Sequence, residues 1–477
     1  MEFMQPGAFK KNANRAMADR DLRSAMAMLN AGMIPNRQGA VDRLPEFEQL
    51  SRRGRELKDH VLVYLDFYLE RFERNCEASG GHVHWCATPE DARRAVLKIC
   101  QSVDAKSVTK GKSMIAEEIH LNTFLEQHDI EPVETDLGEY IIQLAEEPPS
   151  HIIGPAIHKT KDQVSDLFLK HHAVLGRTER QTDPQKMVNE AREILRQKYF
   201  DADVGITGAN YLIAETGSSI IVTNEGNGDL TQTLPKIHIV VASLEKVVPT
   251  LEDATTFLRI LARSATGQEF SAYTTVSTGA RRDDDVDGPG EYHVILLDNG
   301  RSAMLGSEVQ DMLRCIRCGA CMNHCPVYQS IGGHSYGTVY VGPMGAVLSP
   351  ALLGVAEIKH LPCASTLCGR CEEVCPVSIP LPRLLRQWRQ RAFEAGVVPN
   401  VERWALSVWA FFAKRPWLYG LGARLAMRGL AYLGRKEGRM RKLWFAGGWT
   451  QGRDLPAPEG ETFQARWRKQ QRKKVMG

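Results

Sequence analysis

The sequence has no hydrophobic run of the length that a membrane-spanning helix needs. Its longest apolar stretch, residues 404–413 (WALSVWAFFA), is about half that length, and two basic residues and a proline follow it directly. The first residues, MEFMQPGAFKKNANRAMADRDL, lack the apolar core of a secretory signal peptide. We therefore expect a cytoplasmic protein, and peripheral contact with the inner face of the membrane stays open.

The sequence also has little net charge. Its 60 Lys and Arg residues face 57 Asp and Glu residues, which leaves a formal charge of +3 and no field that would attract nucleic acid. Hydrophobic residues make up 43% and charged residues 25%, as in folded globular proteins. The 477 residues are too many for one ordinary core, so we expect roughly two to four domains.

Several common cofactor motifs are missing. No C-x-x-C-H motif for c-type haem occurs. The segment TKGKSM (109–114) ends like a phosphate-binding P-loop, but Lys106 stands where the first glycine of that motif belongs. GNGDLT (226–231) lacks the third glycine of a dinucleotide fingerprint. Without a flavin or nicotinamide site, we do not expect this chain to transfer a hydride unaided.

Cysteine is the residue type that carries information here. Eight of the 11 cysteines lie between residues 315 and 375. In a reducing compartment such crowding indicates metal binding rather than disulfides. The other three, Cys76, Cys86 and Cys100, are scattered, and we interpret them as small buried residues.

The crowded cysteines form two runs, CIRCGACMNHCP (315–326) and CGRCEEVCP (368–376). In two-cluster ferredoxins the last cysteine of each such run binds the cluster of the other run. By that rule one [4Fe–4S] cluster takes Cys315, Cys318, Cys321 and Cys375, and the other takes Cys325, Cys368 and Cys371. Structural zinc would need neither the third cysteine of a run nor its C-P ending. The motif thus predicts two clusters that each carry one electron.

The fourth ligand of the second cluster is open at this stage. Ser365 occupies the position where a regular second run has cysteine, and Cys363 lies two residues before it. A four-residue gap between ligands, as in Cys363-x4-Cys368, occurs in plant-type ferredoxins. The spacing therefore allows Cys363, Ser365 or a ligand of another kind.

Helical and strand-like segments alternate from about residue 61 to 300. Residues 59–76 and 89–103 have the periodicity of amphipathic helices. Buried strands are predicted at 106–110, 151–156, 203–209, 218–225, 238–243 and 292–298. This alternation predicts an α/β layer architecture with a largely parallel sheet.

We divide the chain into four parts on composition. Residues 1–60 are polar and helical, 61–300 form the α/β domain, and 301–395 form a compact helical domain around the cysteines. Residues 396–477 hold six of the eight Trp residues and end in a basic tail. The apolar faces of this extension suit either packing on protein or an interfacial position at a membrane, and we favour packing.

One further segment is a candidate binding site. In GITGANYLIAETGSSIIVTNEGN (205–227), turns at Gly205, Gly208 and Gly217 could present backbone amides to an anion. Glu215 would then stand where a carboxylate could act as nucleophile or base. The alternative, which we favour, is that these glycines only make tight turns and that Glu215 and Glu225 are solvated or cap helices. The lone histidines His120, His238 and His293 lack metal-binding spacing, and we interpret them as structural.

Taken together, these motifs resemble the lactate-utilisation protein B family of bacterial iron–sulfur proteins along nearly the whole chain. The resemblance rests on KGKSMIAEEIHLNTFLE (110–126), ETDLGEYIIQL (134–144), residues 205–227, the two cysteine runs in order, and the C-terminal segments WALSVWAFFAKRPWLYGL and PAPEGETFQARWR. It implies an N-terminal LUD domain, similar to the ribose-phosphate isomerase and CoA-transferase fold. A two-cluster ferredoxin domain and a C-terminal extension would follow it.

The resemblance also implies a role in oxidising L-lactate to pyruvate, with two partner proteins: a cysteine-rich redox subunit and a second LUD-domain protein. The family's cluster ligands fall on the same seven cysteines as above. Relatives often have an aromatic residue where this chain has Cys363. The cysteine at this position therefore departs from the family pattern, and the eighth ligand stays open.

Three functions follow as hypotheses. The leading one is a non-catalytic electron-transfer subunit of an L-lactate-oxidising complex. In the second, the LUD domain is itself catalytic, as an acyl or CoA transferase that uses Glu215, and the clusters are regulatory. In the third, the protein is a redox-sensing scaffold that assembles partners.

Overall fold

The computed structural model describes residues 6–176, 178–443, 447–450 and 453–476. Residues 1–5 of the N-terminal sequence and Gly477 at the end of the basic tail lie outside the described residues. Residues Met1–Glu394 form one compact unit and Ala395–Gly477 form another.

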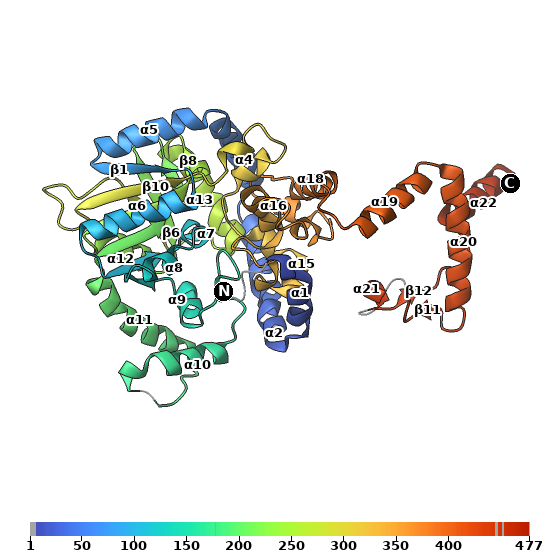
Figure 1. Cartoon of the computed structure of the whole chain (residues 1–477), viewed down its shortest axis with the longest axis horizontal. Helices are drawn as coiled ribbons and strands as arrows, with labels where there is room; N and C mark the ends of the chain where they lie inside the picture. The colour runs from blue at the N-terminus through green and yellow to red at the C-terminus, as the bar shows by residue number, and fades with distance from the viewer. Residues whose placement is uncertain (1–5, 177, 444–446, 451–452, 477) are drawn as a thin grey trace. The chain divides into compact units, whose positions relative to one another are not determined.

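Six parallel strands form the central sheet in the order β1-β10-β7-β4-β2-β3 (Figure 1). They are β1 (Gly81–Cys86), β2 (Ser107–Gly111), β3 (Glu131–Glu134), β4 (Val204–Gly208), β7 (Ile237–Ser243) and β10 (Glu291–Leu297). The predicted α/β architecture with a parallel sheet is therefore confirmed, although β1 and β3 were missing from the predicted strands.

Both faces of this sheet are covered, which explains why its strands are nearly continuous apolar runs. In β7, Ile239 and Val241 pack toward helices α6 (Pro89–Ser102), α7 (Met114–Glu118) and α8 (Leu121–Glu126). Val240 and Ala242 alternate with them and pack toward α5 (Leu65–Ala78) on the other face. The N-terminus of α6 is held by a capping box between Thr88 and Asp91.

A second, smaller sheet lies beside the first. It has the order β8-β5-β6-β9, and its strands are β5 (Tyr211–Ile213), β6 (Ser218–Thr223), β8 (Val247–Val248) and β9 (Tyr273–Ser277). Helix α13 (Leu251–Ala265) packs on β5 and β8, and it contributes Phe257 and Ile260 to a buried core. This core continues into the cysteine-rich segment.

The predicted strand over 151–156 is wrong, because these residues form a loop. The His151 ring accepts hydrogen bonds from the backbone N–H groups of Ile153 and Gly154, both at 3.1 Å. Such local side-chain bonds replace the ladder bonds of a strand, and Pro155 has no N–H to offer. The predicted helix over 59–76 is likewise split, since α4 (Phe47–Val63) ends at Val63 and Tyr64 separates it from α5.

The N-terminal helices pack against the cysteine-rich segment. Besides α4, they are α1 (Phe9–Ala18), α2 (Arg20–Met28) and α3 (Ile34–Asp42). Met26 and Leu29 share the buried core of the cysteine-rich segment. Arg37 donates a hydrogen bond to the Val374 carbonyl at 3.0 Å, and the Ser51 hydroxyl donates one to the Pro376 carbonyl at 2.8 Å. These helices therefore hold the second cysteine run in place.

The cysteine-rich segment is a set of short helices around the two runs. They are α14 (Ala320–Asn323), α15 (Pro326–Ile331), α16 (Gly342–Leu353), α17 (Arg370–Glu373) and α18 (Leu381–Glu394). Each run ends at a proline, and Pro326 begins α15 at the first helical position, where a missing N–H costs nothing.

The C-terminal unit contains three longer helices, α19 (Asn400–Ala413), α20 (Pro416–Gly434) and α22 (Phe463–Met476). Large aromatic side chains on α19 and α20 are exposed, among them Trp404, Trp409 and Trp417. Across the described ranges, no helix combines the length and apolarity needed to cross a membrane.

Candidate metal centre and an adjoining cavity

Four of the predicted ligands line one small cavity. Its sulfur atoms come from both runs: Cys315, Cys318, Cys321 and Cys375. The rest of its wall is almost entirely apolar and includes Ile152, Met344 and Val377. The fold thus brings the last cysteine of the second run to the first three of the first run, which is the arrangement expected of crossed ligands.

The chemistry of this cavity suits a positively charged metal group. Burial raises the pKa of the Cys318 thiol to about 12 and that of Cys375 to about 11. Without metal these thiols are therefore neutral, and a bound cation is needed to hold them as thiolates. The backbone N–H groups of Arg317 and Ile379 donate to the sulfurs of Cys315 and Cys375, both at 3.4 Å. Such bonds favour sulfur that carries negative charge.

The remaining predicted ligands form a second group. Burial raises the pKa of the Cys371 thiol to about 12, and the neighbouring thiols of Cys325 and Cys368 add to this rise. Cys368 itself is exposed, and the backbone N–H of Arg370 lowers the pKa of its thiol. Three sulfurs from both runs therefore lie together a second time.

The two runs have the same backbone conformation around their central cysteine. Arg317 before Cys318 and Leu367 before Cys368 are both left-handed, with φ of 61° and 55°. A glycine with positive φ follows each cysteine, Gly319 at 73° and Gly369 at 87°. In both cases a one-turn helix, α14 or α17, begins directly after that glycine.

This repeat identifies the position equivalent to Cys315. In the first run the N–H of Arg317 donates to Cys315 Sγ, and in the second run the N–H of Leu367 donates to Ser365 Oγ at 3.1 Å. Cys363 is exposed at the end of the 3-10 helix η8 (Leu361–Cys363), before this turn. Ser365 and not Cys363 therefore occupies the ligand position of the repeated turn.

A buried ion network joins the cysteine-rich segment to the α/β domain. Arg301, 1% exposed, pairs with Glu118 at 2.6 Å and with Glu245 at 3.1 Å. Arg317 pairs with Glu245 at 3.1 Å, and Tyr340 donates to Glu118 at 2.5 Å. Burial alone would raise the pKa of Glu245, but the charges of Arg301 and Arg317 lower it to about 2. The network keeps both carboxylates ionised.

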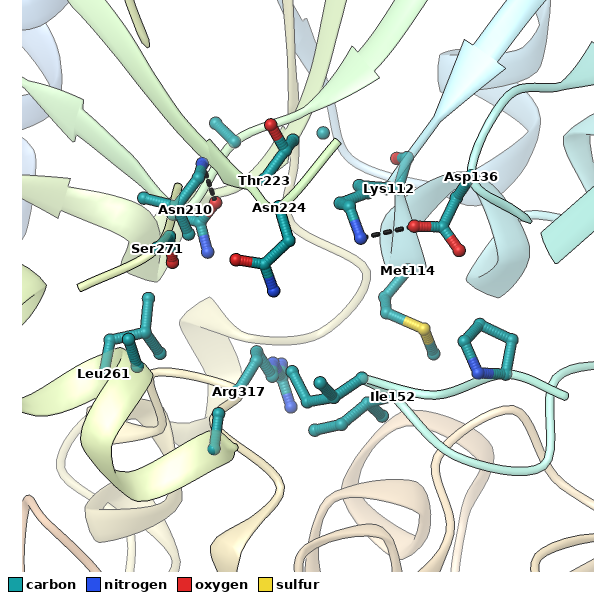
Figure 2. Close-up of a pocket in the computed structure, with 18 of the residues that line it drawn as sticks. Lys112, Met114, Asp136, Ile152, Asn210, Thr223, Asn224, Leu261, Ser271 and Arg317 are labelled. Carbon is teal, nitrogen blue, oxygen red and sulfur yellow. Dashed lines mark hydrogen bonds and ion pairs between the residues drawn. The ribbon is translucent and has the colours of Figure 1, made fainter. Parts of the chain in front are cut away.

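A larger cavity of about 140 Å³ adjoins the thiol cavity. It lies where β2, β4 and β7 end, the edge of a parallel sheet at which ligands usually bind. Figure 2 shows Lys112 and Asp136 on one side of it, Asn210 and Asn224 on another, and Arg317 at the bottom of the view. Ile152 lines both cavities and therefore forms part of the wall between them.

The charges around this cavity are unevenly paired. Lys112 forms an ion pair with Asp136. Glu139 is buried, and burial followed by the nearby carboxylates raises its pKa well above the usual value. Lys246 is 7% exposed, and burial followed by the charge of Arg317 lowers its pKa to about 7.

The residues of the candidate binding segment 205–227 do not form one site. Gly208 lines the larger cavity, but added Cβ atoms on Gly205 and Gly217 would meet backbone atoms at 1.7 and 2.1 Å, so these two glycines serve close packing. Glu215 is exposed in the turn between β5 and β6, outside the cavity wall, and its carboxylate accepts from the Leu251 N–H at 3.4 Å. The geometry gives Glu215 no part in a catalytic centre at this cavity.

Sequence reasoning missed the charged residues of the cavity. Lys112 belongs to the KGKS segment, which does not match the P-loop motif, and the sequence therefore gave Lys112 no role. Asp136 lies in ETDLGEYIIQL (134–144), which supported the family resemblance without giving Asp136 a role, and Lys246 has no local motif. The one available signal was their position, because each follows a predicted or observed parallel strand closely.

The structure also places the histidines that the sequence analysis named. His238 is buried and bonds to Thr207 at 2.8 Å, and His293 lies 3.1 Å from Glu291. Within the described ranges, the one histidine–acid group close enough to share an ion is Glu147, His158 and His334. Its carboxylate already pairs with Lys159 at 2.5 Å, which opposes a cation.

Comparisons with known families match three consecutive parts of the chain. The LUD domain matches residues 69–297, the 4Fe-4S dicluster domain matches 311–379, and the C-terminal domain of lactate utilisation protein B matches 395–472. The order agrees with the domain order that the resemblance implied.

Curated relatives match over nearly their whole length. Lactate utilization protein B of Geobacillus kaustophilus is 44% identical over 463 residues, which cover 96% of each chain. The Bacillus subtilis protein of the same name is 43% identical and covers 96% of this chain and 95% of its own. An Escherichia coli relative described as an electron transport protein, YkgF, is 41% identical and covers 97% of each chain. The chain therefore belongs to the lactate utilization protein B family and carries a 4Fe-4S dicluster domain.

Proposed function

We propose that this protein is the iron–sulfur electron-transfer component of a complex that oxidises L-lactate to pyruvate. Oxidation of lactate to pyruvate releases two electrons and two protons, and a [4Fe–4S] cluster carries one electron at a time. Two clusters in one chain suit a relay between a two-electron donor on a partner and a one-electron acceptor. The observation that carries this proposal is the cavity lined by Cys315, Cys318, Cys321 and Cys375, in which sulfurs of both runs meet.

The ligand assignment is part of the proposal. Cys315, Cys318, Cys321 and Cys375 hold one cluster, and Cys325, Cys368 and Cys371 hold three irons of the other. When bound, the clusters supply reversible one-electron transfer. The protein supplies the thiolates, the N–H bonds to sulfur and an apolar wall that keeps water away.

The α/β domain is proposed to have the ribose-phosphate isomerase and CoA-transferase type of fold, in agreement with its six-stranded parallel sheet. It is not proposed to be a transferase through Glu215, because that side chain lies on the surface. Its place in the complex is to position the clusters, to which the Glu245 and Glu118 network ties it.

The partners are proposed to be a cysteine-rich redox subunit and a second LUD-domain subunit, with no nucleic acid. The C-terminal unit has exposed Trp side chains and many more basic than acidic residues, which supports peripheral contact with an anionic membrane face. Flotation of the full-length protein with vesicles that contain anionic lipid, at low and high salt, tests this contact. Equal recovery with neutral vesicles would count against it.

The test of the main function is anaerobic purification with the two partners. We expect about eight irons and eight sulfides per chain after reconstitution, since two cubanes contain four of each. L-Lactate should then produce the EPR signals of reduced clusters in the complex. One zinc per chain and no sulfide would contradict the electron-transfer function.

A further inference from the structure

The larger cavity contains a buried lysine without a counter-ion. Lys246 is 7% exposed and lines the cavity, and within the described part of the chain its ammonium has neither a hydrogen-bond acceptor nor an ion-pair partner. The other lysine of the cavity, Lys112, is paired with Asp136. A buried ammonium without a partner is costly, so such a group indicates a site for an anion that is supplied from outside.

A second donor faces the same space. The Asn210 carboxamide accepts a hydrogen bond from the Val222 N–H at 3.0 Å, which fixes its orientation. Its amide nitrogen has no acceptor within the described residues, and Asn210 lines the cavity, where Figure 2 shows it beside Asn224. The cavity therefore offers one positive and one neutral donor whose acceptors are missing.

The size of the cavity limits what can bind. Its volume of about 140 Å³ lies below the roughly 300–1,000 Å³ of sites for drug-sized ligands and cofactors. A molecule of a few heavy atoms fits inside it.

The cavity lies next to the first cysteine run. Arg317, which lines it, stands between Cys315 and Cys318 in the first cysteine run. Ile152 lines both this cavity and the thiol cavity. A ligand held by Lys246 would therefore lie beside the proposed first cluster, within one layer of side chains.

We propose that this cavity is a binding site for a small carboxylate, in which Lys246 binds the carboxylate and Asn210 donates to a ligand oxygen. A carboxylate suits the site because an ammonium and a side-chain amide together provide charge-assisted and neutral donors for its two oxygens. The choice of lactate and pyruvate as ligands to test rests on the proposed function, whereas the site itself rests on these side chains.

The test measures binding of L-lactate and of pyruvate to the reconstituted full-length protein by anaerobic calorimetry, without partner proteins. We expect saturable binding of at least one of them and weaker binding of inorganic phosphate and sulfate. Lys246→Met keeps the length and volume of the side chain and should weaken binding about tenfold or more, the range for a lost bond to a charged group. Lys198→Met, which removes the same charge from an exposed site, should change nothing.

A second pair of variants guards against a folding defect in Lys246→Met. Asn210→Asp retains the acceptor for Val222 N–H but places a negative charge in the cavity, so carboxylate binding should be lost. Asn189→Asp adds the same charge on the exposed face of α11 (Pro184–Asp201) and should bind normally.

Two results would overturn the proposal. One is that neither lactate nor pyruvate binds to wild-type protein that contains its full iron and sulfide. The other is that Asn210→Asp and a folded Lys246→Met bind as tightly as the wild type. Because cluster content is measured on the same samples, loss of binding with intact clusters leaves the electron-transfer function standing.

Discussion

Ser365 Oγ accepts a hydrogen bond from the backbone N–H of Leu367 at 3.1 Å, just as Cys315 Sγ accepts one from Arg317. The two turns share their left-handed residue and the glycine that follows. A cluster bound in the second run would thus meet an oxygen where the first run offers a sulfur. The exposed Cys363 lies before the turn.

This relationship predicts how the second cluster behaves in air. A cubane iron without a thiolate is lost on oxidation and leaves a [3Fe–4S] cluster. Ser365→Cys should restore a regular run and slow this conversion about tenfold or more, and Ser365→Ala should speed it. Cys363→Ala should convert at the wild-type rate, as measured by EPR after exposure to air. If Cys363→Ala converts promptly while Ser365→Ala does not, the fourth ligand is Cys363.

Cys375 should belong to the cluster of the other run. It lines a cavity with Cys315, Cys318 and Cys321, so Cys375→Ser should damage the cluster that those three hold. The measurement is EPR of the reduced protein together with iron and sulfide analysis. Loss of the signal of the cluster at Cys368 and Cys371 instead would mean that each run binds its own cluster.

Glu245 should stabilise the joint between the two domains. Glu245→Gln leaves Arg301 and Arg317 without their shared carboxylate, and breaking a buried network in this way costs about 3–5 kcal/mol. The melting temperature at neutral pH should fall clearly. Glu269→Gln removes an exposed partner of Arg43 and is the matched control, for which we expect little change.

The effect of Glu245 should also depend on pH. Its pKa is about 2 in the folded protein and 4.5 ordinarily, so the stabilisation is complete above the ordinary pKa and is lost as the pH falls toward the folded one. The difference in melting temperature between wild type and Glu245→Gln should therefore shrink as the pH is lowered from about 6 toward about 3. The cluster-free protein serves here, since acid destroys clusters. A difference that stays constant with pH would show that Glu245 acts through packing.

A carboxylate in the larger cavity should lower the reduction potential of the first cluster. Reduction adds an electron beside Arg317, and a bound anion nearby disfavours that added negative charge. An EPR-monitored redox titration with and without saturating lactate or pyruvate measures the shift, and Lys246→Met should abolish it. If the reduction potential is the same with and without ligand, a charge in the cavity has no electrostatic effect on the first cluster.

The sequence by itself determined the order of the parts and the chemistry of the cysteines. Ligand spacing in a cluster motif is local, because three thiolates on one turn must reach one cubane whatever surrounds them. The parallel sheet followed for a similar reason, since strands buried on both faces, such as Ile237–Ser243, read as continuous apolar runs.

Only the tertiary structure decided which side chains meet across the chain. His151 turns an apparent strand into a loop through its own hydrogen bonds, and that loop places Ile152 between two cavities. Lys246 carries no motif, and the motif over 205–227 gave no role to Asn210. The two side chains face one cavity because β4 and β7 are neighbours in the sheet. The role of position 365 became visible in the same way. Spacing alone left two residues open, whereas the repeated turn places the Ser365 hydroxyl where the first run has a thiol.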